Sequence, residues 1–122
     1  MDTNTITVVY KWTAKSGQLD ALKGIYDEVT DAMQANEPGA LEVQVYVSES
    51  ENALYVRDVF ADAGALGFHL SETAGPHFPN LLEIATPGAF YFFGDVPAEM
   101  QQAAKGMGLA AEFAGQTTGF NR

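Results

Sequence analysis

The chain has 122 residues, a length typical of one domain, and 47% of them are hydrophobic against 18% charged, which is the balance of a globular protein. Sixteen acidic and six basic residues leave a net charge of −10, so neither a nucleic-acid backbone nor an anionic membrane surface is expected as a partner. The absence of cysteine excludes disulfide bonds, thiolate zinc sites and iron–sulfur clusters.

The first residues, Met1-Asp2-Thr3-Asn4, are acidic and polar, unlike the basic and then apolar start of a secretion signal. No apolar run approaches the ~18 residues of a membrane span. We therefore expect a soluble cytoplasmic protein that binds no membrane.

Residues 5–13 alternate between two faces, which predicts a half-buried strand with Ile6, Val8, Tyr10 and Trp12 on one side. Apolar residues then recur at spacings of three and four, which predicts an amphipathic helix with Ser16 as its N-cap. The members of this stripe are Leu19, Leu22, Ile25, Tyr26, Val29 and Met33. Asn36-Glu37-Pro38-Gly39 is expected to end the helix.

Residues 41–48 and 54–60 alternate again, and the polar segment Ser48–Asn52 between them is expected to be a hairpin turn. So short a connection requires an antiparallel pair. Asp58 and Phe60 share a face with Leu54 and Val56, so all four should point toward the helices.

Asp62 is expected to cap a short helix that carries Leu66, His69 and Leu70 on one stripe. Gly75-Pro76 should interrupt this helix, and a second helical stripe should follow until Thr86-Pro87-Gly88. Residues 89–95, which include the aromatic run 90–93, are expected to form the fourth strand.

This order predicts an α+β fold, the ferredoxin-like βαββαβ arrangement with an antiparallel four-stranded sheet. Right-handed crossovers place both helices on one face of the sheet. The other face is too apolar for plain solvent surface, so we expect a homodimer built by apposing two such faces. The residues expected there are Val9, Tyr46, Tyr55, Val59 and one pair of the fourth-strand aromatics, with Lys11, Gln44 and Arg57 among them.

Residues 1–95 are therefore expected to form the domain, and residues 96–122 an extension of it with two short helices. Pro97 can begin a helix, and four later glycines interrupt any long element. The glycine-rich end, with Phe113 and Phe120, is expected to cover the mouth of a cavity.

The chain resembles the antibiotic-biosynthesis-monooxygenase-like family of the dimeric α+β barrel superfamily over about residues 5–95. The resemblance implies a barrel-like homodimer and cofactor-independent oxidation of aromatic substrates such as anthrones and quinols, with no metal, flavin or nicotinamide. Asp58 and Phe60 stand where the family often has Glu and Trp, and about three extra residues lie between Ser71 and His77. The resemblance rests on Lys15-Ser16-Gly17-Gln18, Glu37-Pro38-Gly39, Arg57-Asp58-Val59-Phe60-Ala61-Asp62, Ala65-Leu66, Phe68-His69-Leu70 and His77-Phe78.

Two candidate catalytic residues emerge, namely Asp58 and His69, because both are expected to face one cavity and an imidazole titrates near neutral pH. The alternative for His69 is a half-buried histidine held by a backbone carbonyl or by Asp58. His77 is expected in a loop, where two alternatives are open: it contacts a ligand, or it has no role in binding. No metal site is predicted, because no HxH or HExxH spacing occurs.

The cavity is expected to hold an apolar small molecule between the helices and the sheet. The leading function is binding of such a molecule, with cofactor-independent monooxygenation of a quinol-like or anthrone-like substrate as its catalytic form. A non-catalytic binder of an apolar or fatty-acyl ligand and a structural dimer without ligand are the alternatives. The expected ligand-binding residues are Tyr10, Trp12, Leu22, Tyr26, Val29, Leu54, Val56, Phe60, Leu66, Leu70 and His77.

Overall fold

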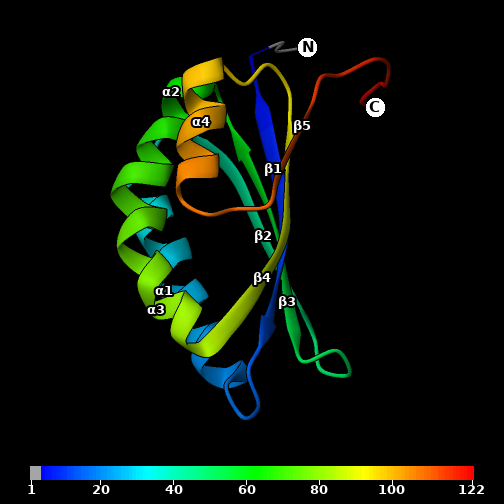
Figure 1. Cartoon of the computed structure of the whole chain (residues 1–122). Helices are drawn as coiled ribbons and strands as arrows, with labels where there is room; N and C mark the ends of the chain where they lie inside the picture. Colours follow the sequence, from blue (N-terminus) through cyan, green and yellow to red (C-terminus); the bar gives the residue numbers. More distant parts are fainter. Residues whose placement is uncertain (1–3) are drawn as a thin grey trace.

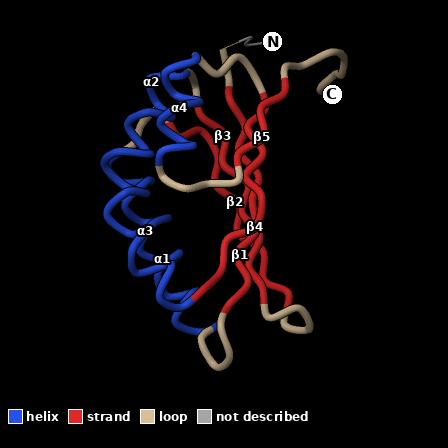
Figure 2. Tube along the Cα trace, viewed as in Figure 1, coloured by secondary structure: helices blue, strands red, loops and turns tan. Residues whose placement is uncertain are grey.

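The computed structural model describes residues 4–122, so the interpretation of Met1-Asp2-Thr3 as a polar start lies outside the described residues. A layer of helices covers one face of a single sheet, and the opposite face of the sheet is uncovered (Figures 1 and 2). In chain order the elements are β1 (Ile6–Ala14), α1 (Leu19–Asn36), β2 (Ala40–Ser48), β3 (Ala53–Phe60), α2 (Ala63–Phe68), the π-helical turn η1 (His69–Ala74), α3 (Gly75–Ile84), β4 (Ala85–Phe93), α4 (Ala98–Gly106) and β5 (Ala111–Ala114).

The sheet has the strand order β2-β3-β1-β4-β5. The first four strands pair antiparallel, as the sequence predicts, and the α+β ferredoxin-like fold is confirmed. The predicted sheet of four strands was incomplete, because β5 adds a fifth strand that runs parallel to β4.

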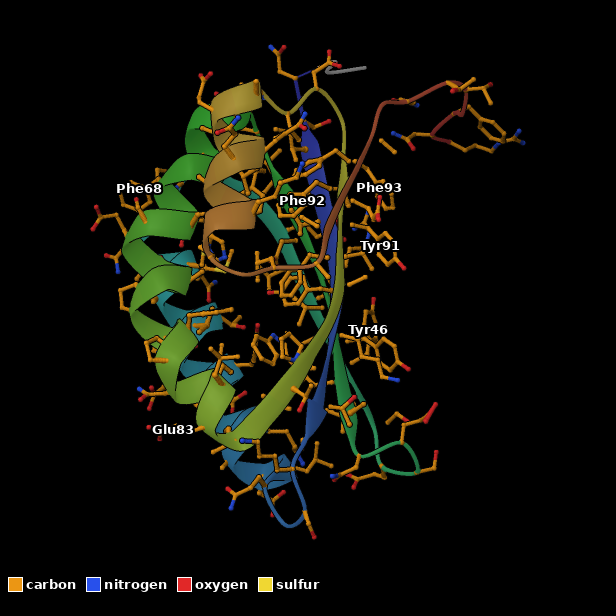
Figure 3. All side chains as sticks on the ribbon, viewed as in Figure 1. Tyr46, Phe68, Glu83, Tyr91, Phe92 and Phe93 are labelled. Atoms are coloured by element: carbon orange, nitrogen blue, oxygen red, sulfur yellow. The ribbon has the colours of Figure 1, made fainter. Side chains whose placement is uncertain are left out.

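Alternation along the strands divides the two faces of the sheet. On β1 every second residue from Ile6 is buried, and the interleaved ones are partly open to solvent. The aromatic run of β4 splits in the same way, because Phe92 points toward the helices while Tyr91 and Phe93 point to the uncovered face (Figure 3).

Helix α1 begins at Leu19, so Ser16 is not its N-cap as predicted. Gly17 has a φ of +76°, and this left-handed residue directs the backbone out of the helical region between Ser16 and the helix. Gln18 occupies the capping position without a side-chain hydrogen bond. The predicted cap of the second helix is confirmed, since the Asp62 carboxylate accepts a 2.8 Å hydrogen bond from the Ala65 amide.

Gly75-Pro76 does not break the second helical segment, and His77 therefore lies in α3 and not in a loop. The helix passes from α2 through η1 into α3, and the Gly75 amide donates to the Leu70 carbonyl five residues earlier. A proline is tolerated in the first turn of a helix, and the wide π turn precedes it here. A Cβ atom at residue 75 would lie 3.0 Å from the Leu70 carbonyl oxygen, so glycine suits this turn.

Strand β4 begins at Ala85, four residues before the predicted start, and Thr86-Pro87-Gly88 lies inside it. The pairing of β4 with β1 shifts register between Tyr10 and Trp12. Proline inside a sheet is tolerated at such irregularities, because one backbone amide there has no ladder partner.

The C-terminal segment forms one helix, α4, and the strand β5, so the prediction of two short helices was wrong. Its Phe113 ring stacks on Phe92 with centroids 5.0 Å apart. Phe120 is 74% exposed and does not cover the sheet–helix layer. Within residues 4–122, every helix is too short or too polar to qualify as a membrane span.

Candidate active site

A cavity of about 40 Å³ lies between the inner face of the sheet and the helices. The expected site residues line it with three exceptions: Leu22, Leu54 and Val56 are packed in the core and do not reach it. The side chains that line it are Val8, Tyr10, Trp12, Tyr26, Val29, Asp58, Phe60, Leu66, His69, Leu70, Ala74, His77, Phe78, Leu81, Phe90, Phe92, Met107 and Leu109.

The space is smaller than the long cavity expected from the sequence. A cavity of ~150 Å³ holds one benzene molecule, so about 40 Å³ admits water-sized groups and not an aromatic ring. The rings of Phe78, Phe90 and Phe92 line the space that remains. Met107 and Leu109, from the segment that joins α4 to β5, also line the cavity, so the early part of the C-terminal segment contributes to its wall.

A chain of buried hydrogen bonds runs through the cavity wall to Asp58. The Trp12 indole donates to the Tyr26 hydroxyl over 2.9 Å, and the Tyr26 hydroxyl donates to that of Tyr10 over 3.2 Å. Tyr10 then donates to the Asp58 carboxylate over 3.2 Å. Strand pairing explains the convergence: Val8 lies opposite Asp58 across the β1–β3 ladder, and Tyr10 is the next residue of β1 on the same face.

Asp58 is the most unusual group of the cavity. Asp58 is only 2% exposed, and its Oδ1 atom has no hydrogen-bond partner. Burial is the main cause that raises the pKa of Asp58 from 3.8 to about 6. The charge of His69 and the hydrogen bond from Tyr10 lower this pKa in part. The charge of Glu37 raises it further. The carboxyl group therefore changes protonation close to neutral pH.

The two tyrosines remain protonated phenols under the same conditions. Burial is the largest cause that raises the pKa of Tyr10 well above its usual value, and the Asp58 charge acts in the same direction. Burial also raises the pKa of Tyr26, against the lowering effect of its hydrogen bond with Tyr10. The Tyr10 hydroxyl therefore supplies a hydrogen to Asp58, and the Tyr26 hydroxyl supplies one to Tyr10.

His69 binds a carboxylate that the sequence did not single out. Its Nδ1 lies 3.1 Å from Glu37 Oε2, and the Thr73 hydroxyl donates to the same oxygen over 2.5 Å. Burial would raise the pKa of Glu37, but the hydrogen bonds from His69 and Thr73 and the His69 charge outweigh it and lower the pKa. The expected partners of His69, a backbone carbonyl or Asp58, were therefore wrong as hydrogen-bond partners.

Aromatic rings form the remaining wall. Tyr10 stacks on Phe90 with centroids 4.5 Å apart and planes 14° apart, and Trp12 meets Phe78 and Phe90 edge-on. The Phe60 ring lies 5.1 Å from the His69 ring. These rings pack on one another in the offset-stacked and edge-to-face geometries that aromatic pairs prefer. Among residues 4–122, no three His, Asp or Glu side chains group closely enough to hold a metal ion.

The family model for antibiotic biosynthesis monooxygenase matches residues 5–79. A search of curated protein sequences gave no match. Among solved structures, MupZ from Pseudomonas fluorescens is similar at a TM-score of 0.79 and 18% identity, over 98% of this chain and 95% of MupZ. SnoaB, a cofactor-independent oxygenase from Streptomyces nogalater, is similar at 0.63 and 18%, over 78% of this chain and 96% of SnoaB.

A conserved protein from Methanosarcina mazei Go1 is similar at a TM-score of 0.66 and 19% identity, over 77% of this chain and 95% of that protein. Identities this low establish a shared fold. The similarity to MupZ spans nearly the whole chain, whereas those to the other two structures leave about a fifth of it uncovered.

Proposed function

Because the chain belongs to the antibiotic biosynthesis monooxygenase family, we propose that it binds a small hydrophobic molecule in the cavity beside Asp58. The observation that carries this proposal is the Oδ1 atom of Asp58, which is buried and has no hydrogen-bond partner, in a residue that lines a mostly apolar cavity. A buried polar atom without a partner costs free energy unless a ligand supplies one.

The ligand chemistry follows from the wall. A charged or sugar-like ligand would lose its hydrogen bonds to water on binding, and apolar side chains cannot replace them. Most of the proposed ligand is therefore apolar. A single acidic hydrogen, on oxygen or on an activated carbon, gives Asp58 its missing partner.

The catalytic form of the proposal is cofactor-independent oxygenation of an anthrone-like or quinol-like substrate. Asp58, as the carboxylate, accepts the proton of the activated carbon, and the resulting carbanion reacts directly with dioxygen. For an anthrone the balance is one CH₂ group and one O₂ giving one carbonyl group and one water. The name of SnoaB, a cofactor-independent oxygenase with this fold, supports that reaction class.

Entry of a ring requires the wall to open, because the cavity is about 40 Å³. Met107 is suited to such a movement, since its flexible thioether side chain lies in the short segment between α4 and β5. A second candidate function, a non-catalytic binder of an acyl chain, requires an opening too, but a narrower one, because a chain is thinner than a ring. Each buried CH₂ contributes about 0.8 kcal/mol to such binding.

The uncovered face of the sheet supports a homodimer. Tyr46 is 56% exposed there, and Tyr91 and Phe93 are each 44% exposed (Figure 3). Obligate dimers commonly bury upward of ~2,000 Å² in total, so the proposed dimer requires about half of that area on each sheet face. The one ion pair on this face, among the described residues, joins Arg57 to Glu42 over 2.7 Å.

Oxygen uptake tests the proposed function. Wild-type protein with anthrone should consume oxygen at a rate that saturates with substrate, above the rate without protein. Asp58→Asn should lower that rate by about 10²- to 10⁴-fold, the usual contribution of a general base. Asp31→Asn, which removes the same charge from an exposed position of α1, is the matched control and should leave the rate unchanged.

An equal rate in Asp58→Asn would overturn the assignment of Asp58. Saturable binding without oxygen uptake would support the acyl-chain binder, and the absence of both would refute the small-molecule site.

A further inference from the structure

The His69 ring lies between two environments. It lines the cavity with Asp58, whereas Glu37, which contacts its Nδ1 atom, does not line that cavity. Nδ1 and Nε2 flank one ring carbon and point in divergent directions, so with Nδ1 directed at Glu37 the second nitrogen, Nε2, points away from that carboxylate. His69 is 5% exposed, so bulk solvent hardly reaches the ring, and the group that Nε2 meets lies within the protein or in the cavity that the ring lines.

The Glu37 carboxylate is held through one of its oxygens, because Oε2 has two hydrogen-bond partners and Oε1 is buried without one. Thr73 donates to its Oε2 atom, which is the oxygen that also contacts His69, and both residues belong to η1. The backbone that follows Glu37 lies directly on α2, because a Cβ atom at Gly39 would come within 2.6 Å of Ala65 Cβ. An ionised carboxylate only accepts hydrogen bonds, so the hydrogen of this contact belongs to Nδ1.

We propose that Glu37 is a positioning residue, which keeps a hydrogen on Nδ1 of His69 so that Nε2 exchanges a proton with the molecule in the cavity. This inference rests on the proposed function and narrows its substrate class to aromatics that carry a hydroxyl beside the reactive carbon. Asp58 takes the proton from carbon, and Nε2 takes the one from the hydroxyl.

In that second transfer the O–H bond breaks, an N–H bond forms and the electron pair stays on the substrate oxygen. The imidazolium that results is balanced by the negative charge of Glu37. The charged and titratable groups that face His69 are Glu37, from the end of α1, and Asp58, from β3, with the Tyr10 hydroxyl behind Asp58. A carboxylate that orients a histidine in this way also selects its tautomer.

The ¹⁵N chemical shifts of the histidine ring test the tautomer without any substrate. The chain has two histidines, so His77→Gln assigns both sets of signals. Neutral His69 is expected in the Nδ1–H form. Glu37→Leu, which removes the acceptor, should change the ratio of tautomers at least about 10-fold toward Nε2–H, and Glu37→Gln, whose carbonyl still accepts, should restore part of it.

Glu42→Gln is the matched control, because it removes a carboxylate from the outer face of the sheet and should leave the His69 signals unchanged. If Glu37→Leu does not fold, the wild-type spectrum and Thr73→Val decide: the valine variant should shift the ratio in the same direction by a smaller factor. An Nε2–H tautomer in the wild type, or an unchanged ratio in a folded Glu37→Leu protein, would overturn the inference.

Oxygen uptake then separates this inference from the proposed function. Glu37→Gln should lower the rate with a hydroxylated anthrone about 10-fold more than the rate with unsubstituted anthrone. An equal loss with both substrates would overturn the role of Nε2 while leaving Asp58 in place. No uptake with either substrate in the wild type would refute the oxygenase, and the role of Nε2 in it, while the spectrum still reports the tautomer that Glu37 selects.

Discussion

Replacing Asp58 by Asn is expected to stabilise the folded protein by an amount that grows with pH. The folded-state pKa of Asp58 is about 6, above its ordinary value of 3.8, because the carboxyl group is buried. The native protein therefore holds this proton more tightly than the unfolded chain does. The stability that the proton contributes is fully present below pH ~4 and is lost as pH rises through the folded-state pKa.

The magnitude follows from the difference between the two pKa values, which is about two units. At about 1.4 kcal/mol per unit, ionised Asp58 costs about 3 kcal/mol of unfolding free energy above pH 7. Asparagine has no such cost. Its amide next to Tyr10 adds a contribution to the unfolding free energy that does not vary with pH. The test is therefore how the difference in unfolding free energy between the two proteins changes with pH, and not its absolute value.

Urea denaturation of both proteins, followed by far-ultraviolet circular dichroism from pH 4 to pH 8, measures this difference. The unfolding free energy of Asp58→Asn minus that of the wild type should rise by about 3 kcal/mol, with most of the rise between pH 4 and pH 6. The exposed Asp31→Asn variant should give a flat difference. If the difference in unfolding free energy between Asp58→Asn and the wild type stayed constant or fell as the pH rose, burial would not destabilise the ionised form of Asp58.

Three further outcomes are expected. Tyr55→Lys should dissociate the proposed homodimer at micromolar concentration in sedimentation velocity, whereas Glu83→Lys on the helical side should not (Figure 3); a dimer in both would contradict a sheet-face interface. Removing residues 107–122 should raise the dissociation rate of a bound anthrone about 10-fold, because Met107 and Leu109 leave the cavity wall, while removing 116–122 should leave that rate unchanged; equal rates would show that this segment is no cover. Gly39→Ala should lower the unfolding free energy measured by urea denaturation by about 1–3 kcal/mol, because the new Cβ atom overlaps that of Ala65 on α2. An unchanged unfolding free energy would contradict the close approach of this loop to α2.

The bounds of β1, β2 and β3 were predictable to within one residue, because their side chains alternate between two faces in the sequence. Along β1 the pattern from Ile6 to Trp12 has period two in the sequence, and the burial of the structure has the same period. The partition of the fourth-strand aromatics also follows from alternation, because Phe92 can face the helices only if Phe93 faces away.

Proline and glycine were the main source of error. Gly75-Pro76 and Pro87-Gly88 are strong local signals for a break, but both lie inside regular elements. A π turn and a register shift, which depend on neighbouring elements, accommodate them. The strand at Ala111–Ala114 was missed for the same reason: four residues between glycines carry little strand signal, and the free edge of β4 supplies the pairing.

The site divides in the same way. Tyr10, Tyr26 and Asp58 were selected because periodicity decides which face of a strand or helix they occupy. Glu37 and Thr73 were not, because their contacts join residues 32 and 36 positions apart and depend on how a loop lies against η1. The volume of the cavity was overestimated, since apolar periodicity identifies inward residues but not how completely their rings fill the space.

Fluorescence of Trp12 tests most directly the proposal that a small molecule binds beside Asp58. This single tryptophan lines the cavity and donates a hydrogen bond to Tyr26. Titration with a hydroxylated anthrone, corrected for absorption with free tryptophan, should give a saturable change with one site per chain. Asp58→Asn should weaken the binding about 10-fold, as expected for the loss of a charge-assisted hydrogen bond. A change that does not saturate, and that equals the change seen with free tryptophan, would contradict a ligand site beside Asp58.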